Sequence, residues 1–266
     1  MRMKLEGKVV IVTGASYGIG RAYAHALAGV GATVVVSART LGRAGADGTP
    51  QPGTLAETVA SGNHLPGRIF AKACDMLVEA DVVRMIDETV ANFGRVDMLI
   101  NNAAIYTHHD TFEIDQPTWD QHLDLNLRGP YFAMREVARH MKRQRSGSVV
   151  NITSAVAGHT EHGHGGHDDM MLYCVSKAAL NRMTDFFAEE LREYGVAVNA
   201  LSPGAVDTDT WNAVDPATVA NFKEQGLVRP CTPEALGGPV IALALHTAAT
   251  MTGQILHTGE YAKSWN

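Results

Sequence analysis

The chain has few cysteines and no long hydrophobic run. Its three cysteines, Cys74, Cys174 and Cys231, stand far apart in 266 residues, and none belongs to a CxxC pair. An odd number of widely spaced cysteines suits a reducing compartment better than a disulfide framework. The amino end lacks the apolar segment of a signal peptide, and no stretch approaches the ~20 apolar residues that a bilayer span requires. These absences predict a cytoplasmic protein with no membrane partner.

The chain also has no block of lysine and arginine. It carries 22 Lys and Arg against 28 Asp and Glu, for a formal net charge of -6. This balance argues against nucleic acid or an anionic membrane as the main partner and favours small molecules. A hydrophobic content of 45% over 266 residues is enough for one large core. We therefore expect a single α/β domain that spans residues 1–266.

A glycine-rich turn follows the first predicted strand, residues 8–13. The turn reads Thr13-Gly14-Ala15-Ser16-Tyr17-Gly18-Ile19-Gly20, and an alanine-rich helix over residues 21–30 comes next. Glycine turns the chain sharply, lets the backbone approach a pyrophosphate and lets the helix pack closely on the strand. The helix amino terminus then faces the phosphates with its free N–H groups. An ordinary strand-to-helix loop is the alternative, but strand, turn and helix in this order favour a dinucleotide site.

Tyr173 and Lys177 stand four residues apart in a predicted helix over residues 173–194, so their side chains share one face. An ammonium about 4 Å from a phenol, at an effective dielectric of ~20, is worth roughly 4 kcal/mol, or about three pKa units. Such a shift would bring the tyrosine pKa towards neutral, where the phenol can exchange a proton with a substrate oxygen. The same spacing occurs by chance on many solvated helices, so the pair gains meaning only from the rest of the chain.

The glycine spacing TGxxxGIG and the YxxxK pair together resemble the short-chain dehydrogenase/reductase family over nearly the whole chain. The resemblance implies a Rossmann-type, doubly wound parallel sheet of about seven strands with helices on both faces. It also implies an oxidoreductase that interconverts a ketone and a secondary alcohol. In that family Tyr173 would be the acid/base, and Lys177 would lower its pKa and bind the nicotinamide ribose. Ser154, preferred over Thr153, would polarise the carbonyl, and Asn126 would support the proton relay.

The resemblance also implies a set of cofactor-binding residues. They are Gly14, Ser16, Gly18, Ile19, Gly20, Arg39, Asp75, Met76, Asn102, Ala103, Tyr173, Lys177, Pro203, Gly204, Val206 and Thr208. Arg39 follows the second predicted strand, where NAD-binding chains commonly place an acid, and an arginine there accommodates a 2′-phosphate. NADP(H) is therefore the preferred cofactor, with NAD(H) as the alternative. A cap on the next helix is nearly as good an account of Asp75.

Four segments carry no settled role. Residues 40–66 are punctuated by glycine and proline and are expected to form a surface elaboration near the adenosine end. Residues 106–116 border the active site in the family, but a surface loop is the favoured interpretation. Residues 207–227 are expected to form the substrate lid. The run 158–169 holds four histidines and three carboxylates, and we favour a substrate-facing loop with no metal over a zinc or nickel site, because glycine makes ordering it costly.

Two rival functions and an assembly also follow from the sequence. A 3-oxoacyl thioester reductase, acting on acyl carrier protein or CoA substrates, would share every motif. A redox-inactive nucleotide-binding regulator would have little use for all four catalytic residues.

The family commonly forms a homotetramer through helices such as 118–142 and 173–194, with a homodimer as the alternative. Tyr261 and Trp265 are costly to leave in water, so we expect them to pack against a subunit neighbour or over the active-site mouth.

Overall fold

One parallel sheet organises the protein. The computed structural model describes residues 4–42, 53–158, 169–206 and 231–265. The sheet has seven strands in the order β3-β2-β1-β4-β5-β6-β7, and every neighbouring pair is parallel. The strands are β1 (Val9–Thr13), β2 (Thr33–Ala38), β3 (Arg68–Ala73), β4 (Met98–Asn101), β5 (Gly147–Ile152), β6 (Val196–Ser202) and β7 (Ile255–His257). The fold is the Rossmann-type doubly wound sheet that the sequence predicts.

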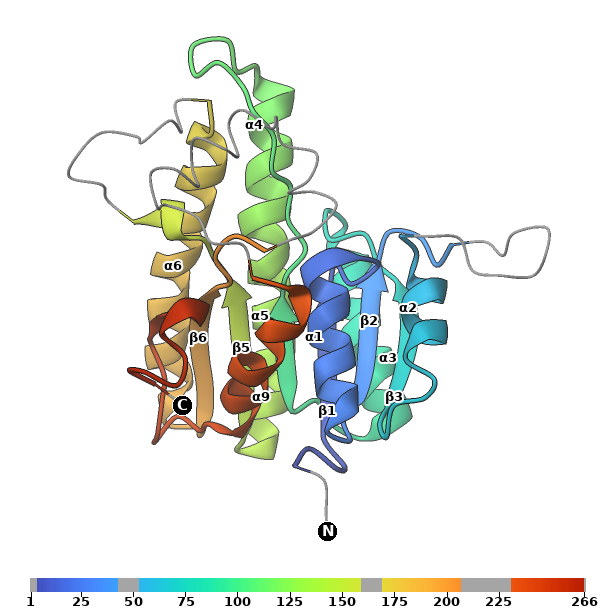
Figure 1. Cartoon of the computed structure of the whole chain (residues 1–266). Coiled ribbons are helices and arrows are strands. Elements are labelled where there is room, and N and C mark those ends of the chain that lie inside the picture. Colours follow the sequence, from blue (N-terminus) through green and yellow to red (C-terminus); the bar gives the residue numbers. More distant parts are fainter. Residues whose placement is uncertain (1–3, 43–52, 159–168, 207–230, 266) are drawn as a thin grey trace.

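Helices cover both faces of the sheet (Figure 1). They are α1 (Gly18–Gly29), α2 (Leu55–Ser61), α3 (Glu79–Phe93), α4 (Gln116–Leu123), α5 (Gly129–Gln144), α6 (Met171–Arg192) and α9 (Gly237–Leu245), with short helical turns η1 (Asp124–Arg128), η2 (Ala155–Ala157), η3 (Pro233–Leu236) and η4 (Thr258–Glu260). Side chains of α1 and α9 pack into one hydrophobic cluster, and side chains of α3, α5 and α6 pack into the other. Within the described part of the chain, no helix combines the length and apolar character needed to cross a bilayer.

The strands are apolar on both faces because each face is covered. All five residues of β1 are buried. Val10 and Val12 face the cluster that contains α1, whereas Ile11 faces the cluster that contains α3. Successive side chains of a strand point to opposite faces of the sheet. Because both faces of this sheet are covered, the strand needs a continuous β-branched, apolar run.

The single helix that the sequence predicts over residues 118–142 is interrupted. The structure has α4, then one π-helical turn η1, then α5. Asn126 lies inside this turn, and its amide hydrogen-bonds both backbone groups of Ile105. A π turn inserts an extra residue into an α-helix and is common at functional sites. Here it accompanies the amide contact that holds the helix to the chain after β4.

The carboxyl-terminal aromatics pack on their own chain, which corrects the prediction of a subunit contact or an active-site cover. Trp265 is only 8% exposed and joins the cluster that contains α9. Its indole N–H donates to the His257 carbonyl at 3.3 Å. The Tyr261 ring lies 5.2 Å from the Trp265 ring and packs against Gly238, where an added Cβ would lie 2.7 Å from the ring. The two rings therefore bury apolar surface against their own chain.

Candidate active site

The carboxyl ends of β1 and β4 form the point where the strand order reverses. From β1 the chain moves outward through β2 and β3, and from β4 it moves outward in the opposite direction. Doubly wound sheets bind ligands in the crevice outside the strand ends at such a point. Gly14 follows β1 there, and Asn102 and Ala103 follow β4. The sequence places its candidate cofactor residues in these same segments.

The glycine turn is held tightly against the end of β4. Gly14 has φ +65, and a Cβ added to it would lie 2.7 Å from the Cα of Ala103. A Cβ added to Gly20 would lie 2.4 Å from the Gly14 carbonyl oxygen. The Asn102 side-chain amide donates to the carbonyls of Thr13 at 3.0 Å and Gly14 at 2.9 Å. Only glycine fits both turn positions, so the backbone itself forms the cradle.

The start of α1 fits the phosphates of a dinucleotide. The helix begins at Gly18, and its N-cap residue, Tyr17, makes no side-chain capping hydrogen bond. The first N–H groups of a helix have no intrahelical partner and attract anions. The buried Ser37 hydroxyl, near the end of β2, has no hydrogen-bond partner among the described residues. Arg39 follows β2 and is exposed. These groups fit a nicotinamide dinucleotide: the turn would hold the pyrophosphate, and the end of β2 would hold the adenosine ribose.

Arg21 joins the glycine turn to α2. Its guanidinium donates to the Ser16 carbonyl at 2.5 Å, to Glu57 Oε2 at 2.5 Å and to Thr58 Oγ1 at 3.1 Å. The hydrogen bond from Arg21 lowers the pKa of Glu57. Helix α2 therefore braces the turn, a role that the sequence did not assign to the segment 40–66. Since Arg21 is already paired, Arg39 is, among the described residues that follow β2, the cation that a 2′-phosphate could engage.

Three candidate catalytic residues meet at the ends of β5 and α6. Ser154 follows β5, and Tyr173 and Lys177 lie in the first turns of α6. The Ser154 side chain hydrogen-bonds Tyr173. The Lys177 ammonium donates to the Ile152 carbonyl at 2.7 Å and lies 5.6 Å from the centre of the Tyr173 ring. Thr153, the alternative to Ser154, has a buried hydroxyl with no partner within the described ranges.

The pKa values of the pair differ from the sequence expectation. Burial raises the pKa of Tyr173 to about 12, and the hydrogen bond from Ser154 offsets only part of this rise. Burial also lowers the pKa of Lys177 to about 8. The expectation that Lys177 brings the Tyr173 pKa towards neutral is therefore wrong for the chain by itself. Attraction between the two charges alone would lower the Tyr173 pKa, but the cost of removing each charge from water shifts the pKa of Tyr173 up and that of Lys177 down.

Asn126 clamps the chain after β4 and contacts α6. Its Oδ1 accepts from the Ile105 N–H at 2.8 Å, and its Nδ2 donates to the Ile105 carbonyl at 2.9 Å and to Ser176 Oγ at 3.1 Å. The Ser176 hydroxyl donates in turn to the Tyr173 carbonyl at 2.8 Å. Sequence reasoning missed both partners. Ser176 could have been found as a polar residue on the buried face of α6, one position before Lys177, but a backbone partner such as Ile105 leaves no signal in the sequence.

The segment after Ile105 borders the site, which corrects the surface-loop interpretation of residues 106–116 at its start. The Tyr106 ring meets the Tyr173 ring edge to face at 5.1 Å. His108 pairs with Asp169, the residue that lies two positions before α6, at 2.6 Å. Further along, Phe112 is 97% exposed, so the tip of the segment is a surface turn as predicted. No pattern in the sequence indicates which part of the segment turns inward.

Most of the other predicted cofactor residues lie just after β3, just after β6 and at the start of α1. The Asp75 carboxylate accepts from the Leu77 N–H at 3.0 Å and so closes a local turn. The Met76 side chain is buried. Pro203 and Val206 are buried after β6, and Gly204 has φ +75. Ile19 is half-buried in the first turn of α1. Thr208, the predicted lid 207–227 and the predicted histidine loop, except Gly158 and Asp169, lie outside the described residues.

One group of metal-ligating side chains occurs within the described ranges, on α3 and α5. Asp87, Glu136 and His140 hold their ligand atoms within 4.8 Å of one another. Arg139 pairs with Glu136 at 2.8 Å, and Arg143 donates to His140 Nδ1 at 2.9 Å. The arginines already supply the positive charge that a cation would bring. We assign no metal to this group.

A glycine cradle at the strand-order reversal, together with a serine, a tyrosine and a lysine at the next strand ends, defines a dinucleotide-dependent oxidoreductase. The family model described as short chain dehydrogenase matches residues 8–218. The chain therefore belongs to the short-chain dehydrogenase/reductase family, whose members act on CH–OH and keto groups with NAD(P).

Relatives and solved structures agree with this assignment. The chain is 32% identical to the Aquifex aeolicus 3-oxoacyl-(acyl-carrier-protein) reductase FabG over 97% of this chain and 98% of that one. It is 34% identical to galactitol 2-dehydrogenase from Agrobacterium fabrum, over 80% and 76%. A Beutenbergia cavernae structure, provisionally named an NAD(P) dependent gluconate 5-dehydrogenase and carrying NADP at low occupancy, has a TM-score of 0.81, 31% identity and 98% coverage of both chains.

Proposed function

We propose that the protein is an NADP(H)-dependent oxidoreductase that interconverts a ketone and a secondary alcohol in the cytoplasm. The meeting of Ser154, Tyr173 and Lys177 beside the glycine cradle carries this proposal. A nicotinamide held at the glycine cradle would supply the hydride for this reaction. Ser154 donates a hydrogen bond to the substrate oxygen, and Tyr173 gives that oxygen its proton. In oxidation the same tyrosine takes the proton back.

The pKa of Tyr173 supports carbonyl reduction as the direction that needs no prior ionisation. With a pKa of about 12 the phenol is protonated at neutral pH and can act as the acid. Lys177, with a pKa of about 8, is mostly charged at neutral pH and places a positive charge next to Tyr173. Asn126 fixes the first turn of α6 through Ser176, and we propose that it also supports proton exchange with solvent.

The acid/base role is tested by removing only the phenol oxygen. Tyr173→Phe should retain nucleotide binding and lose more than about 99% of turnover, because the ring stays and the proton donor goes. Tyr194→Phe, at a phenol that follows α6, is the matched control and should keep wild-type turnover. Turnover is followed by nucleotide absorbance with a panel of ketones, and binding by fluorescence titration. A Tyr173→Phe enzyme that keeps more than a few per cent of the wild-type rate would refute the role.

The preference for NADP(H) is supported by Arg39, which is exposed just after β2, while Arg21 is held by Glu57. Arg39→Asp should exchange an attraction to the 2′-phosphate for a repulsion and so reverse the ratio of kcat/KM for NADPH over NADH. Arg84→Asp, on the exposed side of α3, is the control for the change in net charge. An unaltered ratio in Arg39→Asp would remove the residue from cofactor selection.

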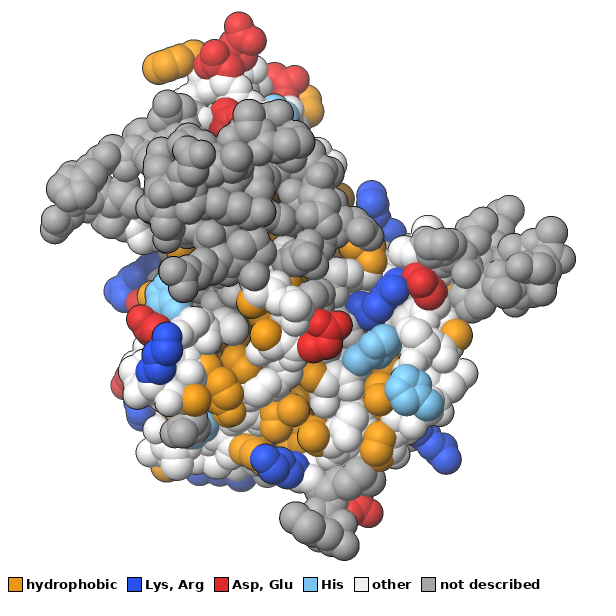
Figure 2. Space-filling view, in the orientation of Figure 1, with side chains coloured by type: hydrophobic (Ala, Val, Ile, Leu, Met, Phe, Trp, Pro, Cys, Tyr) orange, Lys and Arg blue, Asp and Glu red, His pale blue; other side chains and the backbone are white. Residues whose placement is uncertain are grey.

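Reduction of 3-oxoacyl thioesters is the second candidate, because relatives such as the Aquifex aeolicus FabG carry that name. The chemistry would be the same, and the substrate would arrive on a carrier. The described rim of the site argues against an acidic carrier protein, since Asp110 and Glu113 are exposed on the turn that displays Phe112. Figure 2 shows acidic side chains gathered at the top of the molecule beside hydrophobic ones. Comparison of an acetoacetyl thioester with free ketones separates the two. Turnover with any of them would also exclude a redox-inactive regulator.

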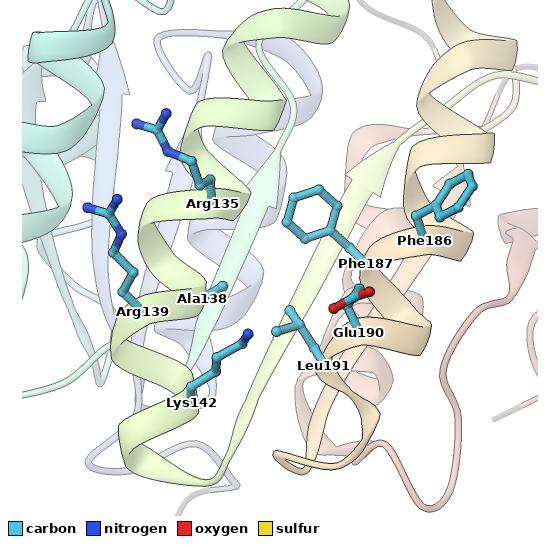
Figure 3. Close-up of a pocket in the computed structure, with 8 residues that line it drawn as sticks. All are labelled: Arg135, Ala138, Arg139, Lys142, Phe186, Phe187, Glu190 and Leu191. Atoms are coloured by element: carbon cyan, nitrogen blue, oxygen red, sulfur yellow. The ribbon is translucent and has the colours of Figure 1, made fainter.

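The proposed assembly is a homotetramer, with a homodimer as the simpler form. Between α5 and α6 a groove is lined by aromatic and charged side chains (Figure 3). Phe186 on α6 is 60% exposed there, and Arg139 and Glu190 offer charges of both signs. An exposed aromatic flanked by both charges suits a second copy of the same face. Phe186→Asp should lower the mass measured by analytical ultracentrifugation, whereas an unchanged mass would place the interface elsewhere.

A further inference from the structure

We propose that His108 and Asp169 form a hydroxyl-binding subsite beside Tyr173, with Tyr106 as its wall. The substrate is then a neutral polyhydroxylated ketone or alcohol, not an acyl chain or an anion. This inference rests on the proposed function, because it concerns the part of the substrate next to the reacting carbon. The three residues come from two segments far apart in the sequence, which the fold brings together at the start of α6.

The Tyr106 ring connects the subsite to the catalytic tyrosine. It meets the Tyr173 ring edge to face at 5.1 Å and the His108 ring edge to face at 4.9 Å. Its hydroxyl lies 3.5 Å from the Met170 sulfur, and burial raises its pKa to about 12. The ring is therefore a neutral, fixed spacer. With about 1.5 Å per carbon–carbon bond, a chain of roughly four to six atoms reaches from Tyr173 past this ring to His108.

With a neutral imidazole at His108, the hydrogen-bonding groups that the pair offers to a ligand are acceptors. His108 Nδ1 lies 2.6 Å from Asp169 Oδ2, so the Nδ1 proton is donated to the carboxylate. In a neutral imidazole this leaves Nε2 as an acceptor. The two side chains are 41% and 48% exposed, which leaves both within reach of a ligand. An acceptor pair binds O–H donors, and a substrate with hydroxyls near its carbonyl supplies them.

The segment that carries His108 is fixed from both sides. The His109 N–H donates to the Asp169 carbonyl at 2.8 Å. The Thr107 hydroxyl lies 2.8 Å from Nε2 of His122 and 2.7 Å from Nε2 of His109. His122 is 1% exposed, and its Nδ1 lies 2.9 Å from the Thr118 carbonyl. A polar pair held in place before the ligand arrives loses less conformational entropy on binding.

The charge of the described part of the rim does not favour anionic substrates. Asp169 faces the subsite, Asp110 lies two residues after His108, and residues 102–115 contain no lysine or arginine. Recognition of a carboxylate or a phosphate would require a cation or a fork of N–H donors, and this wall offers neither among the described residues. A hydroxyl needs only the acceptors that are present. The proposed class of substrate is therefore neutral.

Two four-carbon ketones test the proposal with NADPH. Erythrulose carries hydroxyls on both sides of its carbonyl, and 2-butanone carries none. His108→Leu should lower kcat/KM for erythrulose by at least about tenfold, mainly through KM, and change that for 2-butanone by less than about twofold. His108→Gln, which retains a polar amide, should recover part of the loss. His140→Leu is the matched control, because His140 forms a similar pair with Asp87 at 3.2 Å on α5 and α3.

Equal losses on both ketones would overturn the subsite and leave His108 only a structural part of the loop. An unchanged erythrulose KM in His108→Leu would overturn it as well. Binding separates this proposal from the proposed function. Calorimetric titration of the NADP-loaded protein with erythritol requires no turnover. If the wild type reduces neither ketone, binding that is lost in His108→Leu still supports the subsite, and no binding to the wild type refutes it.

Discussion

Replacing Lys177 by methionine should stabilise the chain while it abolishes activity. Lys177 is 2% exposed, and burial lowers its pKa to about 8, against about 10.4 in water. At 1.36 kcal/mol per unit, the fold holds this charge at neutral pH at a cost of roughly 3 kcal/mol. Methionine keeps most of the apolar stem and carries no charge. It leaves the Ile152 carbonyl without its donor, which costs about 1 kcal/mol.

The net expectation for Lys177→Met is a gain of roughly 2 kcal/mol in the free energy of unfolding at pH 7 without nucleotide. The pH dependence gives an independent check. Between about pH 8 and 10.4 the unfolded chain binds the Lys177 proton and the folded chain does not, so this residue makes stability rise with pH there. The difference between the variant and the wild type should therefore shrink as pH rises through that window.

Urea unfolding followed by fluorescence, at pH 7 and at steps up to pH 10, measures both effects. Turnover with NADPH and a ketone should fall below detection in the same variant. Lys4→Met, at an exposed lysine, is the control and should change stability by less than about 0.5 kcal/mol. A Lys177→Met chain that is less stable than the wild type at pH 7, or a gain that is constant with pH, would refute the reasoning. A gain in the free energy of unfolding together with lost activity would show that keeping Lys177 charged in the site lowers the stability of the fold.

Three further predictions concern the scaffold. Gly20→Ala places a Cβ 2.4 Å from a carbonyl oxygen of the glycine turn, so unfolding experiments should show a loss of about 1–3 kcal/mol, and nucleotide titrations should show weaker binding. Burial alone would raise the pKa of Asp97, but hydrogen bonds led by Arg95 lower it overall. The stability that the ionised Asp97 carboxylate contributes is present above about pH 4 and lost as pH falls. The free energy of unfolding of Asp97→Asn should therefore decrease less steeply at acid pH than that of the wild type, and an unchanged pH dependence contradicts this. Trp265→Ala should cost about 3 kcal/mol or more in the unfolding free energy, whereas a loss below about 1 kcal/mol would mean that the ring is not part of the core.

The sequence predicts the sheet well because its signals are local. The β-branched run of β1 and the glycine turn after it specify a strand, a turn and a helix within a short stretch. The side chains of Tyr173 and Lys177 share a helix face for the same reason. Each of these features depends on residues close together in the chain, so a pattern of neighbours is enough to find them.

The remaining features depend on partners that are distant in sequence. The π turn at Asn126 accompanies hydrogen bonds to the backbone of Ile105, and backbone atoms leave no pattern in the sequence. Tyr106 turns inward because its ring packs edge to face against the ring of Tyr173, which is distant in the sequence. The pKa of Lys177 falls because the assembled core removes water from it. Desolvation is a property of the whole fold, so no spacing of residues could have predicted it.

The pairing of Asn126 with Ile105 has a consequence for redesign. A single side-chain amide satisfies both the N–H and the carbonyl of Ile105, as a neighbouring strand would. The chain is thereby anchored at Ile105, before it reaches the wall of the site. Residues 106–114 can then be exchanged for segments of other length or composition while the end of β4 stays anchored. The contacts of Tyr106 with Tyr173 and of His108 with Asp169 would have to be rebuilt in the new segment. Ile105 is therefore the natural junction for grafting a different specificity onto the end of β4.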